Sequence, residues 1–190
     1  LELAYAGSPG HKDLLNNILD AVLNIDEDGK TLQLNIAGIT GNELLQYDSL
    51  KAKGYTRVPK VFNCKGMVSH GSAIRMVGTA DFSVLLRPPE KYAMAGFPTK
   101  FVESMAVGTP IITNITSDLA DYLHDGDEGL ICADYRSQSI EKQIRYALDL
   151  TDADKDRMRL KARKRAELSF DNIVYLDSFK CFLGSLDSVS

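Results

Sequence analysis

One acidic side chain, Glu103, follows a glycine-proline turn at a spacing that suits a nucleotide. The turn reads Gly96-Phe97-Pro98-Thr99 and leads into a short helical stretch. A helix that starts just after a glycine offers free backbone N–H groups and a positive dipole end, and both favour a phosphate. Glu103 comes four residues after Thr99, so it lies about one turn further along the same helix face. A phosphate at the helix start and a sugar hydroxyl at Glu103 would then lie side by side, which is a nucleotide-binding geometry.

The residues around this segment alternate between strand-like and helix-like patterns. Short apolar runs that predict strands occupy residues 1–6, 32–37, 60–63, 82–86, 111–113 and 129–132. Helical patterns occupy residues 13–23, 43–53, 71–80, 98–107, 118–124, 139–148, 152–168 and 172–183. This alternation predicts an α/β fold, a doubly wound, Rossmann-like parallel sheet with helices on both faces and closing C-terminal helices. Ligands of such folds bind beyond the carboxyl ends of the strands, where we expect the loops 7–12, 87–99 and 114–119 to converge.

The length and the charge of the chain limit its class and its partners. Its 190 residues, with a net charge of -4, fit one globular domain over residues 1–190. An acidic chain lacks the excess of cations that binding to nucleic acid requires, so we expect no nucleic-acid partner. Basic residues cluster between positions 155 and 165, interleaved with acids. They form either a solvated helix face or a patch that meets a membrane surface.

Nothing in the sequence indicates a metal, a cofactor or a membrane span. Cys64, Cys132 and Cys181 are far apart and show no zinc-ligand spacing, which with their odd number favours a reducing cytoplasm. Cys64 and Cys132 lie in strand-like runs, where we expect small buried side chains. No run of about 18 apolar residues and no signal peptide occurs. Because the chain starts at Leu1 and enters a strand at once, we expect an excised domain whose partner domain has been removed.

The segment 95–112 resembles the donor-binding motif of the GT-B glycosyltransferases, in particular the large retaining family 4, of the group 1 type. Its members commonly read E-G-F-G-x-x-x-x-E-A-M-A-x-G-x-P-V-V. This chain reads A-G-F-P-T-K-F-V-E-S-M-A-V-G-T-P-I-I in the same register. Three further matches extend the resemblance over nearly the whole chain: residues 117–131, residues 66–86, and Gly7 with Lys12. Several ordered motifs together make the resemblance specific.

The resemblance implies that residues 1–190 are the C-terminal, nucleotide-sugar-binding half of a GT-B enzyme whose N-terminal acceptor domain is absent. Such an enzyme moves a hexose from a UDP- or GDP-linked donor to an acceptor glycan, here in surface polysaccharide synthesis. It needs no bound metal, and it would work in the cytoplasm or at the inner face of the cell membrane as a peripheral protein. We expect this domain alone to bind donor without turnover. The aromatic-rich stretch 170–183 would pack across to the missing domain.

The resemblance also implies a role for each of five residues. Glu103 would accept hydrogen bonds from the ribose hydroxyls, and the backbone N–H groups of Thr99 and Lys100 would hold the diphosphate. Gly7 would be the strand-end glycine, and Lys12 would balance charge on the departing diphosphate. The alternatives are an exposed helix acid at Glu103 and a solvated helix lysine at Lys12.

The first departure from the family pattern is Ala95, which stands where the family has the acid that contacts the donor sugar. Sugar recognition is then left to the backbone amides near Gly96 and Phe97, or to Arg87 and Glu90 from the preceding loop. Some relatives that read G-F-P-T-K also lack this acid, so its loss does not exclude activity.

The second departure is Ser8, which replaces the arginine that often follows the first glycine. Arg87, at the end of a predicted buried strand, and Lys100 are the candidates to supply the missing cation. An arginine fork matches phosphate oxygens, which favours Arg87. The alternative for Arg87 is an ion pair with Glu90.

The three histidines yield no catalytic assignment. His11 lies beside Lys12, where it could contact phosphate or sugar, whereas His70 and His124 fall at helix edges and are expected to be structural or to face solvent. No serine or cysteine triad has supporting context, so we name no catalytic residue.

Two other functions stay open. Ala95 favours a nucleotide-binding or regulatory module without transfer chemistry, and half of a GT-B-like sugar-nucleotide epimerase is the second alternative. A receiver domain would need paired acids at the end of the strand 1–6, which has none. A dinucleotide dehydrogenase would need G-x-G-x-x-G there, and the Gly-Ser-Pro-Gly sequence at residues 7–10 is a poor match.

Overall fold

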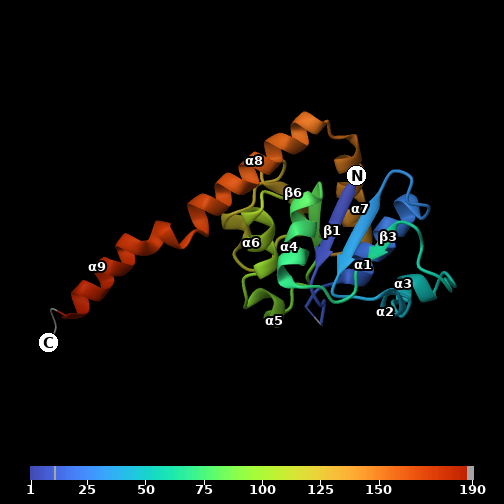
Figure 1. Cartoon of the computed structure of the whole chain (residues 1–190), viewed down its shortest axis with the longest axis horizontal. Coiled ribbons are helices and arrows are strands. Elements are labelled where there is room, and N and C mark those ends of the chain that lie inside the picture. The colour runs from blue at the N-terminus through green and yellow to red at the C-terminus, as the bar shows by residue number, and fades with distance from the viewer. Residues whose placement is uncertain (11, 188–190) are drawn as a thin grey trace.

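A parallel sheet forms the centre of the protein (Figure 1). The computed structural model describes residues 1–10 and 12–187, with side chains described as far as residue 183. The strands are β1 Glu2–Ala6, β2 Gln33–Ala37, β3 Phe62–Cys64, β4 Phe82–Leu85, β5 Ile111–Asn114 and β6 Gly129–Cys132. Their order is β3-β2-β1-β4-β5-β6, and every pairing is parallel. The prediction of a doubly wound α/β fold is confirmed.

The strand order reverses between β1 and β4. The first three strands follow one another outward to one edge, and the last three follow one another to the other edge. The connections after β1 and β4 therefore leave the sheet in opposite directions and open a crevice between them, which is where such folds bind ligands.

Helices cover the sheet in two layers. They are α1 Leu15–Asp26, α2 Gly41–Leu44, α3 Asp48–Lys51, α4 His70–Thr79, α5 Lys91–Met94, α6 Thr99–Ala106, α7 Ser137–Asp149, α8 Asp152–Ser169 and α9 Leu176–Asp187. Successive side chains of a strand point to opposite faces. Leu3 of β1 accordingly belongs to the main hydrophobic core, which also contains Ile18 of α1 and Ile144 of α7. Its neighbour Ala4 packs with Val77 of α4, and α6 lies beside α4 in this second layer.

The prediction of one helix over residues 43–53 is wrong, because the chain forms two short helices there, α2 and α3. Thr40 and Glu43 make a capping box that starts α2, with the Thr40 N–H 2.8 Å from Glu43 Oε2. Tyr47 then adopts an extended conformation at φ -70° and ψ 142°, which interrupts the helical path. The strand predicted at residues 60–63 also begins later, at Phe62.

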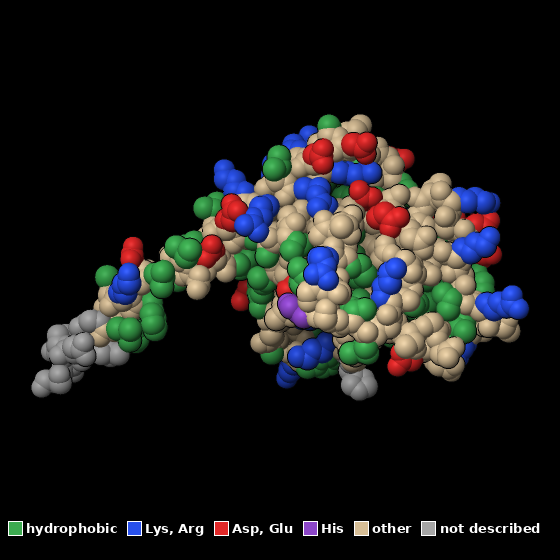
Figure 2. All heavy atoms as spheres, viewed as in Figure 1, with side chains coloured by type: hydrophobic (Ala, Val, Ile, Leu, Met, Phe, Trp, Pro, Cys, Tyr) green, Lys and Arg blue, Asp and Glu red, His purple; other side chains and the backbone are tan. Residues whose placement is uncertain are grey.

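Of the predicted closing C-terminal helices, α7 and α8 pack on the domain, but the last part of the chain does not. After α8 comes a short 3-10 helix, Asn172–Tyr175, and then α9, which projects outward (Figure 1). Apolar side chains lie along this projection (Figure 2), and Ile173, Tyr175 and Phe179 are all exposed.

Two arginines of α8 bind the C-terminal ends of the helices beneath it. The guanidinium of Arg159 donates to the carbonyls of Gly78 and Ala80 at the end of α4, at 2.7 and 2.6 Å. Arg163 donates to the carbonyl of Ala106 at the end of α6. Cations suit these positions, because helix C-termini carry unpaired carbonyls and a negative dipole end.

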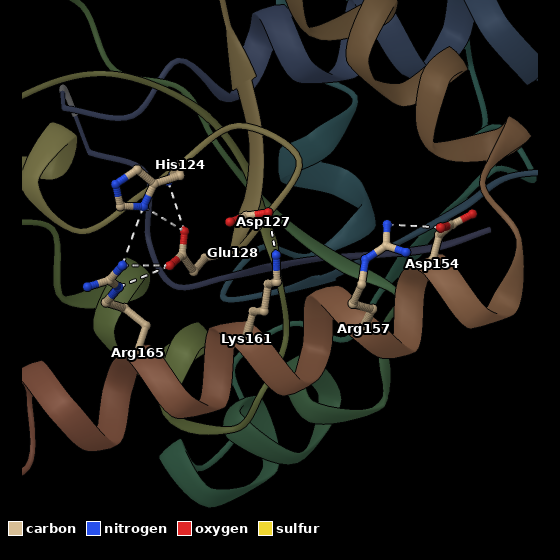
Figure 3. Close-up of polar contacts among 7 residues, drawn as sticks. All are labelled: His124, Asp127, Glu128, Asp154, Arg157, Lys161 and Arg165. Atoms are coloured by element: carbon tan, nitrogen blue, oxygen red, sulfur yellow. Dashed lines mark hydrogen bonds and ion pairs between the residues drawn. The ribbon is translucent and has the colours of Figure 1, made fainter.

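Two further cations of α8 hold the loop before β6 (Figure 3). Lys161 Nζ lies 2.5 Å from Asp127, and Arg165 donates through Nε and Nη2 to Glu128 Oε1 at 3.0 and 2.9 Å. Glu128 also accepts from the backbone N–H of His124 at 2.9 Å. Much of the basic cluster at 155–165 is therefore used inside the domain.

Candidate functional site

The three loops expected at the carboxyl ends of the strands meet there. The N–H of Leu14, after the first loop, donates to the carbonyl of Leu86 at 2.8 Å. The side-chain amide of Asn114, at the end of β5, accepts from the backbone N–H of Arg87 at 3.0 Å and donates to its carbonyl at 2.9 Å. These bonds fix the first and third loops to the segment that follows β4.

The third loop also touches α5 at a strained residue. Ser117 has a φ of 52°, the one positive φ of a non-glycine residue in the described chain. Its N–H points at the sulfur of Met94, at 3.4 Å. This contact joins residues 114–119 to the loop 87–99, as the sequence predicted.

A pocket of about 240 Å³ opens between the N-terminal ends of α4 and α6. It is lined by Ala6, Gly7, His70, Ala73, Ile74, Thr99, Lys100 and Glu103. Four predicted site residues, Gly7, Thr99, Lys100 and Glu103, therefore come together in one place. His70, which the sequence indicated only as a structural or solvent-facing residue, lines the same pocket because α4 begins there.

The backbone of Gly7 and its neighbour Lys100 both favour a glycine at this position of the pocket. Its φ is 116°, a conformation that residues with a side chain rarely adopt. A Cβ on Gly7 would also lie 2.9 Å from Cε of Lys100. The lysine side chain thus passes directly over the end of β1.

A buried carboxylate, Asp13, anchors Arg87 and Lys100, two of the three cations that the sequence proposed for phosphate. Lys100 Nζ lies 2.6 Å from Asp13 Oδ2, and Arg87 Nε lies 3.1 Å from Oδ1. The hydroxyl of Tyr5 donates to Oδ2 at 2.8 Å. The partner of Arg87 in this ion pair is therefore Asp13, where the sequence had offered Glu90.

Sequence reasoning missed Asp13. One acid at the start of the helix predicted over residues 13–23 is ordinary, because it complements the helix dipole, so its type and position gave no signal. Only the fold brings Tyr5, Arg87 and Lys100 around it. Burial, with the charge of Asp13 next to it, raises the pKa of Tyr5 far above its usual range, so the phenol stays a donor.

Buried hydroxyls set the position of α6 against the sheet. Ser104 Oγ lies 2.6 Å from Ser83 Oγ of β4 and donates to the carbonyl of Thr109 at 2.7 Å. Phe101 and Met105 on the same helix are fully buried. This anchoring fixes the helix face that carries Thr99 and Glu103 toward the pocket.

Four other predicted site residues lie outside the pocket. Lys12 is exposed, and Arg87 is buried behind Lys100, with 11% of its side chain exposed. A Cβ on Gly96 would meet nothing within 4 Å, and the ring of Phe97 packs against that of Phe101, with the ring centres 5.7 Å apart, in an aromatic cluster. His11 lies outside the described residues.

Within the described part of the chain, no group of three or more His, Cys, Asp or Glu side chains could hold a metal ion. Among the same residues, no helix combines the length and apolar character that crossing a bilayer requires.

Several solved structures share this fold at low sequence identity. Sucrose-phosphate synthase from Thermosynechococcus elongatus aligns with a TM-score of 0.74 at 17% identity, over 100% of this chain and 46% of that one. HepE from Anabaena, in complex with UDP-glucose, aligns with a TM-score of 0.69 at 13% identity, over 97% of this chain and 48% of that one. The pneumococcal O-GlcNAc transferase GtfA, in complex with UDP and GlcNAc, aligns with a TM-score of 0.64 at 18% identity, over 97% of this chain and 35% of that one. No significant match was found among curated proteins.

This chain spans less than half the length of each of these structures, which fits one half-domain of the GT-B fold. Its sequence matches the family described as "Glycosyl transferases group 1" over residues 2–167. That match covers most of the chain and includes every residue that lines the pocket. The chain belongs to the group 1 glycosyltransferases.

Proposed function

We propose that this chain is the nucleotide-sugar-binding, C-terminal half of a GT-B glycosyltransferase. The pocket at the start of α6 would hold a nucleoside diphosphate sugar. Glu103 would accept hydrogen bonds from the ribose hydroxyls, and the N–H groups of Thr99 and Lys100 would bind the diphosphate. The observation that carries this proposal is that Glu103, Lys100 and Gly7 line one pocket at the sheet's switch point.

Transfer of a hexose would release the nucleoside diphosphate as an anion. The positive end of α6 and the Lys100 ammonium lie where that charge would develop, so they would stabilise the leaving group. The acceptor, a surface glycan in our proposal, would be bound by an N-terminal half. HepE and GtfA, which share this fold, hold UDP-glucose and UDP with GlcNAc, which supports a UDP-linked donor over a GDP-linked one.

Titration of the chain with UDP, GDP and several nucleotide sugars tests the proposal. We expect micromolar to millimolar binding of at least one nucleotide, and Glu103→Ala should weaken it about tenfold or more, because charge-assisted hydrogen bonds are lost. Asp156→Ala, which removes an exposed acid on α8, is the matched control and should leave affinity unchanged. Equal binding by wild type and Glu103→Ala would remove Glu103 from the site.

A module without transfer chemistry is the second candidate, and Ala95 favours it. Ala95 is exposed at the end of α5, and no carboxylate replaces the acid that the family has at this position. We expect this chain alone to bind donor without turnover. A glycan product formed by the isolated chain would contradict that expectation, and an inactive complete enzyme would favour the non-catalytic module.

A further inference from the structure

We propose that Asp13 is a positioning residue that holds the Lys100 ammonium over Gly7, with Arg87 supplying the compensating charge. The diphosphate would then meet one ammonium that is already in place. This inference rests on the proposed function, because it deepens the role of the same pocket.

The geometry of the cluster supports this division of roles. Asp13 is 2% exposed at its side chain, Arg87 11% and Lys100 21%, so exposure rises from the carboxylate to the lysine. Lys100 lines the pocket beside Glu103, whereas Arg87 does not. Asp13 and Arg87 thus form a buried ion pair beneath the pocket, and Lys100 is the member of the cluster that lines the pocket.

The charges of the cluster leave an excess for the ligand. Two cations share one carboxylate, so the three side chains carry a net positive charge. Without Arg87, Asp13 and Lys100 would form a neutral pair, and the attraction for a diphosphate would fall. An ammonium has three N–H donors, so Lys100 can bind Asp13 and a phosphate oxygen at the same time.

The path of Lys100 is fixed on two further sides. Its Nζ lies 5.3 Å from the centre of the Tyr5 ring, and its Cε lies against the Cα of Gly7, where no side chain intervenes. Holding a long side chain in one conformation before the ligand arrives reduces the entropy that binding must lose.

Comparison of UDP and UMP affinities tests the role of Asp13, with GDP and GMP if the wild type prefers guanine. Asp13→Asn should weaken the binding of UDP about tenfold, because the Lys100 ammonium loses its anchor. The affinity for UMP should change by less than about twofold. In a Lys100→Met background, Asp13→Asn should have no further effect, because nothing remains to be positioned. An equal loss in both backgrounds would make Asp13 merely structural, and tighter UDP binding would show that it competes with phosphate for Lys100. Either result would overturn the inference.

A second pair of variants keeps the test decisive if Asp13→Asn does not fold. Arg87→Met should weaken UDP binding although Arg87 does not line the pocket, and Arg87→Lys, which keeps the charge, should restore most of it. Unchanged UDP affinity in Arg87→Met would contradict the charge balance.

Inorganic pyrophosphate separates failure of this inference from failure of the proposed function. A wild type that binds pyrophosphate but no nucleotide would contradict the proposed function and leave the Asp13 test in place with pyrophosphate as the probe. A wild type that binds neither would contradict both.

Discussion

Lys100 and Gly7 are in direct contact at the mouth of the sheet, although they lie 93 positions apart in the chain. The Cε of the lysine lies 2.9 Å from the place that a Cβ on Gly7 would take. The end of β1 and the start of α6 therefore lie close together because the side chain of Lys100 occupies the space that Gly7, with no side chain, leaves free.

Gly7→Ala should lower both stability and nucleotide affinity. The new Cβ meets Lys100 and forces a side chain into a φ of 116°, so we expect a loss of about 1–3 kcal/mol in the free energy of unfolding. Displacement of Lys100 should weaken UDP binding as well. Urea unfolding and calorimetric titration measure the two effects.

Gly10→Ala is the matched control for this change. Gly10 also has a positive φ, 53°, but nothing lies within 4 Å of the place of its Cβ. It should cost only about 1 kcal/mol of stability and leave affinity for UDP unchanged. Equal losses of affinity in the two variants would show that contact with Lys100 is irrelevant.

Arg159→Met should destabilise the domain far from the pocket. It removes two hydrogen bonds to the carbonyls of Gly78 and Ala80, so we expect the free energy of unfolding to fall by about 2 kcal/mol. Lys164→Met on the exposed side of the same helix should change it by less than about 0.5 kcal/mol. Similar values for both variants would mean that α8 is not held by Arg159.

Stability should fall in acid through Glu128. Burial acts to raise the pKa of this carboxyl, but the backbone N–H of His124 and the Arg165 guanidinium outweigh it, so the folded pKa lies below its ordinary value. The contribution of Glu128 is therefore complete above the unfolded pKa of about 4.3 and is lost as the pH falls through the folded pKa. Urea unfolding between neutral pH and acid should show this loss.

Glu128→Gln should lower stability at neutral pH and flatten this acid dependence. The exposed pair of Glu167 with Arg163 offers the control, because both side chains are more than half exposed and solvent screens them. Glu167→Gln should leave the pH profile close to that of the wild type. A profile unchanged in Glu128→Gln would contradict the assignment.

The cysteines should react with iodoacetamide in the order of their exposure. Burial, with Asp134 and Asp125 nearby, raises the pKa of Cys132 to about 12, and burial also raises that of Cys64. Cys181 on α9 is exposed. At mildly alkaline pH we expect rapid labelling of Cys181 and protection of Cys132 until the domain unfolds. Peptide mass spectrometry reads this directly, and rapid labelling of native Cys132 would refute it.

Local patterns predicted most of the fold because each strand and helix is periodic over its own residues. The nearly continuous apolar run of β4, for example, indicates a strand covered on both faces, and all four of its residues are buried. The prediction of one helix over residues 43–53 was wrong because the helix is interrupted by the extended backbone of Tyr47, which no sequence pattern indicates. The direction of α9 depends likewise on the turn around Asn172–Tyr175.

The pocket was predictable only in part. Thr99, Lys100 and Glu103 lie on one short helix, so their spacing alone placed them together. Asp13 has its partners on β1, after β4 and on α6, and only the packed sheet unites them. His70 faces the same pocket because of where α4 starts, a boundary that sequence patterns locate poorly.

Both helices that open onto the pocket finish against the arginines of α8. The C-terminal ends of α4 and α6 are thus both hydrogen-bonded to one helix, α8, through the carbonyls of Gly78, Ala80 and Ala106. If either helix tilts when a ligand binds, these hydrogen bonds must lengthen or α8 must move with the helix. Because α8 leads through the 3-10 helix Asn172–Tyr175 into the projecting α9 (Figure 1), a shift of α8 would also move the start of that projection.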